Sequence, residues 1–372
     1  MKNHKLILGL LISFSFLILT SLNAQKNAKE VEVETASGKK IKTKELDKFI
    51  ESQMKSNNVP GLSFALINKG KMVYNQSYGI QNTETGAAVD DETIFEAASV
   101  SKSVFAYFTL KMVEKGFLDL DTPLYKYLPE EIVENDDRYK LITTRMALSH
   151  TTGLPNWRFF NEDGRLDIKF TPGTKFSYSG EGYEYLAKAL ASIFKTDYAG
   201  LEEIIREEVY EPLTMTNSGF MLKEEVLKSK KANGYEDGKF SDGIPEDLAK
   251  PYFGASFKFH TNAIDFSNFM INLIKEEGMK PETFDEMFSE QVVLPEDEPL
   301  RVEDGFESWS LGFIRAKTPY GLKLVHGGMN PSFQCYFMII KEKKFGFVFF
   351  GNSNTAIEMV PAIEQYLLSG KD

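Results

Sequence analysis

The chain has 372 residues, of which 42% are hydrophobic, so it is long enough for one large core or two. Its formal net charge is −11 and it has no dense run of Lys or Arg, which excludes a nucleic-acid-binding protein and disfavours binding to anionic membrane surfaces. A single cysteine, Cys335, excludes an intramolecular disulfide. The histidines stand far apart and no Cys/His cluster has ligand spacing, so we expect no metal and no other cofactor.

The first residues have the pattern of a secretory signal peptide. Lys2 and Lys5 precede an apolar run from Leu6 to Leu22, and the small residue Ala24 comes before a polar stretch. This order predicts a signal peptide over residues 1–24 and export to the periplasm or the medium, with no membrane contact after cleavage. The alternative is that the apolar run is retained as a membrane anchor. Residues 25–44 are charged and poor in apolar side chains, and we expect a flexible leader there.

The next predicted elements are a helix and a β-hairpin. Apolar residues at helical spacing between residues 44 and 55 predict the helix. Two apolar runs, 62–67 and 72–74, flank the sequence Asn-Lys-Gly at 68–70, which is a hairpin signal.

A candidate nucleophile follows the hairpin. Ser99 and Lys102 lie at the start of a predicted long amphipathic helix that ends at Gly116, and their spacing puts both side chains on one helix face. The free N–H groups and positive end of a helix help to hold an oxyanion and favour the neutral form of a nearby lysine. A neutral amine beside a hydroxyl can take its proton, which indicates a serine nucleophile with a lysine base. The alternative is a serine that caps the helix. The same S-x-x-K spacing also begins at Ser37, Ser52 and Ser192.

The rest of the chain is mostly helical at first and then rich in strands. Residues 181–195 and 200–210 carry apolar side chains at helical spacing. Near the end, three strands are predicted over 322–325, 333–340 and 345–350, and a helix follows from Ile357 to Leu368. Strands joined by short turns form an antiparallel sheet. We therefore predict an α/β sandwich in which both ends of the chain build an antiparallel sheet flanked by helices, with a mostly helical domain inserted.

Five segments in one order resemble the family of serine β-lactamases and penicillin-binding proteins, which includes class C β-lactamases, esterases and D-aminopeptidases. The similarity runs from about residue 45 to the C-terminus and implies one hydrolase domain over residues 45–372. Its sheet subdomain covers about 45–95 and 255–372, and its helical subdomain covers about 96–254. The segments are Phe95–Val104, Gly116–Pro129, Thr144–Pro155, Pro172–Gly180 and His326–Gly328.

The resemblance implies a mechanism for three residues. Ser99 attacks the carbonyl carbon, and Lys102 accepts the serine proton. Tyr178 matches the family tyrosine that relays protons to the leaving group and helps to activate water. A tyrosine has a reference pKa of about 10, so it needs a neighbouring cation to act as a base, and Lys102 would supply it. His150 lies in a family segment that forms a buried turn under the site, so we interpret it as structural.

The resemblance also implies the residues that bind substrate. His326 lies on a strand beside the cleft, and the glycines that follow it, Gly327 and Gly328, indicate a close backbone approach. The oxyanion hole would be the backbone N–H groups of Ser99 and Met329.

Three positions depart from the family pattern. Gly180 stands where the family has an asparagine that bonds the lysine and the substrate amide. His326 replaces the lysine that receives a substrate carboxylate, and Ser332 replaces a common glycine. A histidine with a reference pKa of about 6.5 carries little charge at pH 7, and carboxylated substrates are expected to improve only below pH 6.5. The chemistry is therefore better supported than the β-lactam or D-Ala-D-Ala specificity.

The leading prediction is a metal-independent serine hydrolase that acts on small-molecule esters, amides or D-residue-containing peptides. The nearest rival is a β-lactamase or D-Ala-D-Ala carboxypeptidase. A rival of another class is a cell-wall or peptide-binding protein that keeps the fold without turnover.

Overall fold

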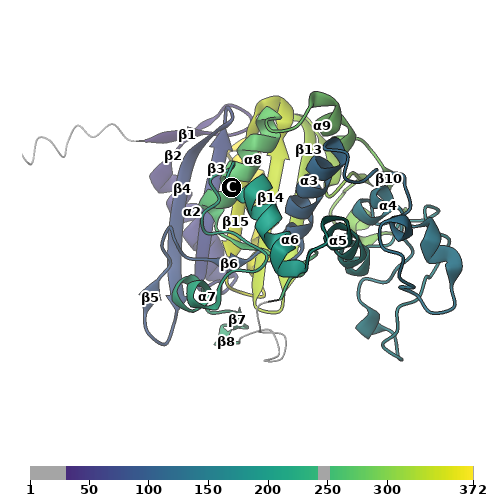
Figure 1. Cartoon of the computed structure of the whole chain (residues 1–372). Coiled ribbons are helices and arrows are strands. Elements are labelled where there is room, and N and C mark those ends of the chain that lie inside the picture. Colours follow the sequence, from purple (N-terminus) through teal and green to yellow (C-terminus); the bar gives the residue numbers. More distant parts are fainter. Residues whose placement is uncertain (1–30, 242–251, 372) are drawn as a thin grey trace, which may run out of the picture.

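The computed structural model describes residues 31–241 and 252–371 (Figure 1), so the predicted signal peptide lies outside the described residues. The main sheet has nine strands in the order β10-β11-β12-β13-β14-β15-β3-β4-β5, and all neighbours are antiparallel. The predicted fold class is thereby confirmed. The strands are β3 (Gly61–Asn68), β4 (Lys71–Asn82), β5 (Ala87–Ala88), β10 (Val292–Val293), β11 (Ser308–Trp309), β12 (Ile314–Thr318), β13 (Gly321–Asn330), β14 (Phe333–Ile340) and β15 (Phe345–Gly351).

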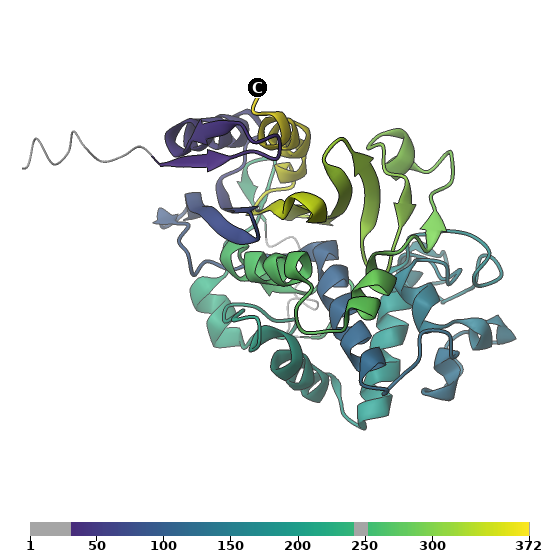
Figure 2. The ribbon, with the colours of Figure 1, turned by 90° about the horizontal axis from the view of Figure 1, so that it is seen from above.

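Helices cover both faces of this sheet (Figure 2). Helices α2 (Thr43–Ser56) and α11 (Val360–Ser369) pack on one face, whereas α3 (Ser101–Glu114) and α8 (Ala263–Lys275) pack on the other. Successive residues of β14 alternate between the two cores because strand side chains point to opposite faces. Tyr336 and Met338 belong to the core under α2 and α11, and Phe337 and Ile339 to the core under α3 and α8.

The segment between β6 (Phe95–Glu96) and β9 (His260–Thr261), which pair with each other, is mostly helix and loop. It returns the chain to the sheet beside the start of α3. A small hairpin of β7 (Tyr235–Glu236) and β8 (Lys239–Phe240) also lies in it. Its remaining helices are α4 (Thr144–Leu148), α5 (Gly180–Phe194), α6 (Tyr198–Ile205), a π-helical turn (Arg206–Tyr210) and α7 (Glu224–Lys230); α9 (Pro281–Phe288) and α10 (Pro299–Val302) follow α8.

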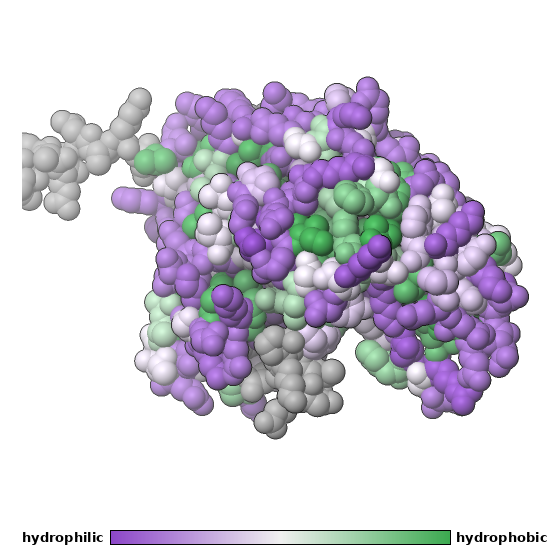
Figure 3. All heavy atoms as spheres, in the orientation of Figure 1, coloured by the Kyte–Doolittle hydropathy of each residue, from purple (hydrophilic) through white to green (hydrophobic). Residues whose placement is uncertain are grey.

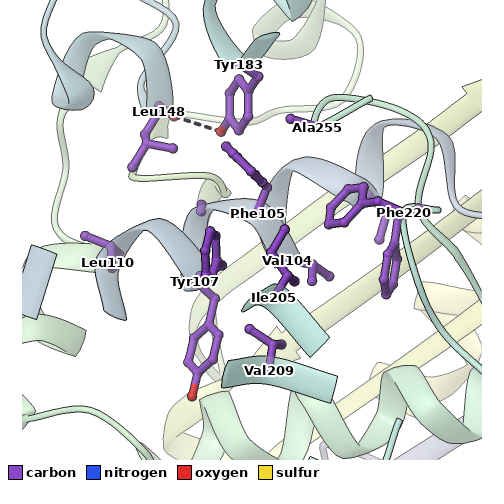
Figure 4. Close-up of a cluster of buried hydrophobic side chains, with 14 of the residues drawn as sticks. Val104, Phe105, Tyr107, Leu110, Leu148, Tyr183, Ile205, Val209, Phe220 and Ala255 are labelled. Carbon is purple, nitrogen blue, oxygen red and sulfur yellow. Dashed lines mark hydrogen bonds between the residues drawn. The ribbon is translucent and has the colours of Figure 1, made fainter. Parts of the chain in front are cut away.

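Helix α3 is buried on all sides, whereas the sequence predicted an amphipathic helix. Figure 4 shows side chains of α3 pointing toward neighbours on several sides, with Tyr183, Ile205 and Phe220 among them. Even Lys102, Ser101 and Ser103 are buried. The helix is therefore a rigid support at the centre of the molecule, and the polar side chains at its start are kept away from bulk water.

The expectation of a flexible leader over residues 25–44 is wrong for its described part. Residues 32–42 form a hairpin of β1 (Glu32–Glu34) and β2 (Lys40–Lys42). Val33 and Ile41 are buried, and the N–H of Ala36 donates to the carbonyl of Leu367 in α11 at 3.0 Å. Alternating apolar residues in a short hairpin are enough to hold this segment once α11 offers a partner.

The face seen in Figure 3 is mostly hydrophilic, with hydrophobic side chains in small separate patches. Within residues 31–241 and 252–371, no helix combines the length and the apolar character that a membrane span requires.

Candidate active site

Ser99 lies on a tight turn that precedes helix α3. The turn is a 3₁₀ helix over Ala98–Val100, and Ala98 has a φ of 43°, which is rare for a residue with a side chain. Pairing of β6 with β9 holds the turn from one side, and the N–H of Ala97 donates to the carbonyl of Phe259 at 2.8 Å. Strained backbone of this kind persists where the surroundings over-determine it, often at functional sites. Ser99 is partly exposed while both its neighbours are buried.

Strand β13 supports the same turn from the other side. A Cβ on Gly328 would lie 2.4 Å from the carbonyl oxygen of Ala97 and 2.6 Å from the sulfur of Cys335, so only glycine fits there. The predicted close approach is correct for Gly328. It is wrong for Gly327, where the nearest atom to such a Cβ is 3.6 Å away, an ordinary contact. The close packing of Gly328 brings the next peptide, that of Met329, beside the Ser99 turn.

Lys102 is the polar centre of the site. Its side chain is 1% exposed, and its Nζ lies 3.3 Å from Ser99 Oγ and 2.8 Å from the carbonyl oxygen of Ser256. Burial lowers the pKa of Lys102 to about 7, against an opposing effect of the Glu184 carboxylate. The neutral amine is therefore available in the neutral pH range. The neutral form comes mainly from burial, a tertiary effect, whereas the sequence argument relied on the helix end.

Tyr178 lies over this lysine. Lys102 Nζ is 4.7 Å from the centre of the Tyr178 ring. Burial raises the pKa of Tyr178, and a hydrogen bond with Ser99 partly offsets that rise. The structure thus brings Ser99, Lys102 and Tyr178 together, as the sequence predicted.

His150 holds the segment that carries Tyr178. It is fully buried, its Nδ1 accepts the N–H of Ser179 at 3.0 Å, and its ring lies 4.3 Å from the Tyr178 ring, centre to centre. Burial keeps its pKa well below the ordinary range. His150 is therefore a neutral structural group, in agreement with its interpretation from the sequence.

His326 is buried beside Tyr178 and Trp309. Its Nδ1 lies 2.7 Å from the carbonyl oxygen of Gly327, so Nδ1 carries the proton and Nε2 is left as an acceptor. Nε2 has no partner within the described part of the chain. Burial, with a contribution from Lys102, lowers the pKa of His326 to about 3. The expected gain for carboxylated substrates below pH 6.5 is therefore wrong, because His326 stays neutral there.

Glu184 and Ser256 join the site without having been predicted from the sequence. The Glu184 carboxylate accepts the hydroxyl of Ser256 at 2.6 Å and its N–H at 3.0 Å. It thereby fixes the loop whose carbonyl receives Lys102. Glu184 is four residues after Gly180 on α5, and this i, i+4 spacing on one helix face was the available signal. Ser256 had no local signal, since it contacts a lysine 154 residues away in sequence.

Of these groups, Ser99, Tyr178, Glu184 and His326 line one cavity of about 1220 Å³, together with Met329 and other residues. Two predicted substrate-binding residues, Gly180 and Gly328, are not among the described residues that line it. Gly328 instead packs against the turn that carries Ser99. A Cβ on Gly180 would lie 2.9 Å from the Trp157 ring and 2.9 Å from the carbonyl oxygen of Asn156. The ring of Trp157 therefore covers Gly180, and the cavity wall there is aromatic.

The charges around the cavity are mainly negative. Arg158 is paired with Glu181 through two side-chain hydrogen bonds of 2.9 and 2.6 Å, which leaves Lys188 as the other lining cation. Among the described residues, no group of three or more His, Cys, Asp or Glu side chains could hold a metal ion. The lining carboxylates are those of Glu181, Glu184, Glu298, Glu303, Asp304 and Glu358.

Comparison with known proteins agrees with this geometry. The family model described as Beta-lactamase matches residues 46–370. Protein flp of Staphylococcus aureus (strain N315) is 24% identical over 346 residues, which cover 87% of this chain and 65% of that protein. Esterase EstB of Burkholderia gladioli is 26% identical over 246 residues, or 58% of this chain and 61% of the esterase. The chain thus spans less than two thirds of the length of these relatives.

Two solved structures share the fold. The octameric penicillin-binding protein homologue from Pyrococcus abyssi has a TM-score of 0.75 at 24% identity, covering 89% of this chain and 78% of its own. The D-alanine carboxypeptidase AmpC from Burkholderia cenocepacia has a TM-score of 0.72 at 20% identity, covering 88% and 99%.

Proposed function

Since the chain belongs to the β-lactamase family, whose members include serine hydrolases, we propose that it is an exported serine hydrolase that cleaves esters or amides through an acyl-enzyme on Ser99. One observation carries the proposal: the buried amine of Lys102 lies 3.3 Å from Ser99 Oγ, and burial lowers its pKa to about 7. A serine hydroxyl needs an adjacent base to become a nucleophile, and a neutral amine at this distance is such a base.

In the acylation step, Lys102 takes the Ser99 proton while Oγ bonds to the carbonyl carbon. The resulting oxyanion accepts hydrogen bonds from the backbone N–H groups of Ser99 and Met329. The tetrahedral intermediate then collapses and the bond from the carbonyl carbon to the leaving oxygen or nitrogen breaks. Tyr178 gives its proton to that leaving atom and regains one from Lys102.

Deacylation repeats these steps with water. Neutral Lys102, through Tyr178, accepts a water proton while the water oxygen bonds to the acyl carbon. Collapse breaks the bond to Ser99 Oγ, and the proton returns to that oxygen, which releases the acid.

The charge of the site favours substrates without a carboxylate. His326 lines the cavity and is neutral, so it supplies no positive charge for a carboxylate. The lining carboxylates outnumber the lining cations. Charge-assisted hydrogen bonds are about twice as strong as neutral ones, so a carboxylated substrate loses its main anchor here. We therefore rank uncharged esters and amides above β-lactams and D-Ala-D-Ala peptides.

The test is labelling followed by turnover. Mass spectrometry after treatment with a fluorophosphonate should find the adduct on Ser99, and a protein without the adduct would be the non-catalytic binding protein. A substrate panel of short-chain aryl esters, D-amino-acid amides, D-Ala-D-Ala peptides and a chromogenic cephalosporin should rank the aryl esters first. N-terminal sequencing of the protein recovered outside the cytoplasm should begin at Gln25 if the proposed signal peptide is cleaved.

A further inference from the structure

Four aromatic side chains, Trp157, Phe159, Phe160 and Phe257, form one wall of the cavity; we call them the aromatic wall. Phe159 and Phe160 are 66% and 69% exposed. The Trp157 and Phe159 rings stack with centres 5.7 Å apart, Phe160 meets Phe159 edge-on at 4.8 Å, and Phe257 meets Trp157 edge-on at 5.1 Å. Grouped apolar side chains that remain exposed mark a binding surface more often than isolated ones do.

The aromatic wall begins at the reacting groups. Trp157 covers Gly180, which is two residues after Tyr178, and leaves no room for a polar side chain at that position. Phe257 directly follows Ser256, whose carbonyl oxygen is 2.8 Å from Lys102 Nζ. A substrate whose carbonyl lies at Ser99 therefore has aromatic surface beside it.

The loop that carries Trp157, Phe159 and Phe160 is held in place. The Arg158 guanidinium makes two hydrogen bonds to Glu181 on α5, and the Arg158 N–H donates to the same carboxylate at 3.0 Å. Glu181 is buried, whereas the Arg158 side chain is 46% exposed, so the loop is fixed to α5 through the buried carboxylate. A wall fixed in advance loses little conformational freedom when a ligand binds.

We propose that the aromatic wall binds an uncharged aromatic or branched hydrocarbon group of the substrate, next to the scissile carbonyl. The inference rests on the proposed function and names its substrate class. Ring groups fit because aromatic pairs gain from stacked and edge-on contacts beyond the burial of area. A carboxylate on that group is disfavoured by the lining carboxylates of the cavity.

The kinetic test compares substrates that differ in one group. The first series varies the acyl group of 4-nitrophenyl esters, which is acetyl, cyclohexylacetyl or phenylacetyl. The second series varies the alcohol of acetate esters, which is ethanol or benzyl alcohol. We expect kcat/KM to be at least about tenfold higher for the cyclohexylacetyl and phenylacetyl esters than for the acetyl ester in the first series, or for the benzyl ester than for the ethyl ester in the second, as hydrophobic pockets discriminate by about 10–200-fold. Phe159→Ser and Phe160→Ser should each reduce that ratio by about threefold or more.

Phe117→Ser is the matched control. Phe117 is 46% exposed, it contacts Phe194, and it does not line the cavity, so its substitution should leave the ratio unchanged. Wild-type turnover with a ratio near one, or a ratio that survives both wall variants, would overturn the aromatic wall as a substrate site.

A binding measurement separates this inference from the proposed function. Calorimetry on Ser99→Ala with N-benzylphenylacetamide, an uncharged amide with two rings, needs no turnover. We expect binding that weakens about fivefold or more when Phe159→Ser is added. Binding of this kind in a protein that hydrolyses nothing would refute the proposed function and keep the wall. Absence of binding together with a flat substrate ratio would refute the wall and keep the hydrolase.

Discussion

The amine nitrogen of Lys102 lies 3.3 Å from the hydroxyl oxygen of Ser99, inside a core that keeps this amine 1% exposed. Because burial lowers the pKa of Lys102 to about 7, the lysine can act as a base in the neutral pH range.

Ser99→Ala should abolish hydrolysis and leave the fold intact. The covalent route disappears, so kcat/KM should fall by at least about 10³-fold. Circular dichroism and the unfolding midpoint check the fold. Ser52→Ala and Ser192→Ala remove serines with the same S-x-x-K spacing, and both should keep full activity. A folded Ser99→Ala protein with wild-type turnover would be incompatible with the assignment.

Lys102→Ala and Tyr178→Phe should each lower kcat by about 10²-fold or more, because both move the same proton. The double variant should lose far less than the product of the two single losses. A full product would mean that the two side chains act independently. Single-turnover kinetics with an aryl ester gives the acylation rate for all four proteins of this cycle.

The acidic limb of the pH profile should report Lys102. Activity should rise with pH through about 7, as the lysine loses its proton. Glu184→Gln removes a negative charge that raises the pKa of Lys102, so the limb should move to lower pH. Four other titratable side chains also face Lys102 and are the same in the wild type and in Glu184→Gln: Tyr178, Tyr183, His150 and His326.

Glu358→Gln is the control for this profile, since it removes another carboxylate that lines the cavity. Its limb should stay at the wild-type position. If the acidic limb of Glu184→Gln lay at the wild-type pH or at a higher pH, the Glu184 carboxylate would not set the protonation of Lys102.

Gly328→Ala should destabilise the protein and impair catalysis. Its Cβ would meet the Ala97 carbonyl at 2.4 Å, and such overpacking costs about 1–3 kcal/mol in the free energy of unfolding. Gly327→Ala is the matched control, because its Cβ would find the nearest atom at 3.6 Å. Urea unfolding of both variants measures the difference. Equal stability of the two variants would mean that strand β13 does not pack tightly against the turn that carries Ser99.

His326→Ala should change the choice of substrate more than the chemistry. His326 is neutral, and its buried Nε2 is an unpaired acceptor within the described chain, so we expect it to receive an N–H or O–H from a substrate that fills the adjoining cavity. Its loss should lower kcat/KM about tenfold for D-amino-acid amides and less for aryl esters, which lack such a donor.

Because the pKa of His326 is about 3, wild-type turnover of a cephalosporin should not improve between pH 8 and pH 6 through His326. Efficient cephalosporin hydrolysis at pH 8, unaffected by His326→Ala, would restore the β-lactamase interpretation.

Local patterns in the sequence were sufficient for the central strands of the sheet and for the candidate pair of Ser99 and Lys102. The hairpin of β3 and β4 and the three strands β13 to β15 follow from short apolar runs separated by turn residues, which are signals that depend on neighbours in the chain. Ser99 and Lys102 were predicted from their spacing, and Tyr178 from the resemblance of residues 172–180 to a family motif. The same signals failed for residues 31–42, where β1 and β2 depend on contact with α11 at the other end of the chain.

Only the tertiary structure decided how these side chains behave. The pKa of the Lys102 amine falls to about 7 because the chain buries it, and its carbonyl partner, Ser256, lies 154 residues away. The acceptor state of His326 depends on one backbone contact, and the aromatic character of the cavity wall depends on Trp157 covering Gly180. Burial, proton position and close packing all depend on contacts between segments that are far apart in the sequence. Spacing along the chain shows only which residues are near one another in the sequence.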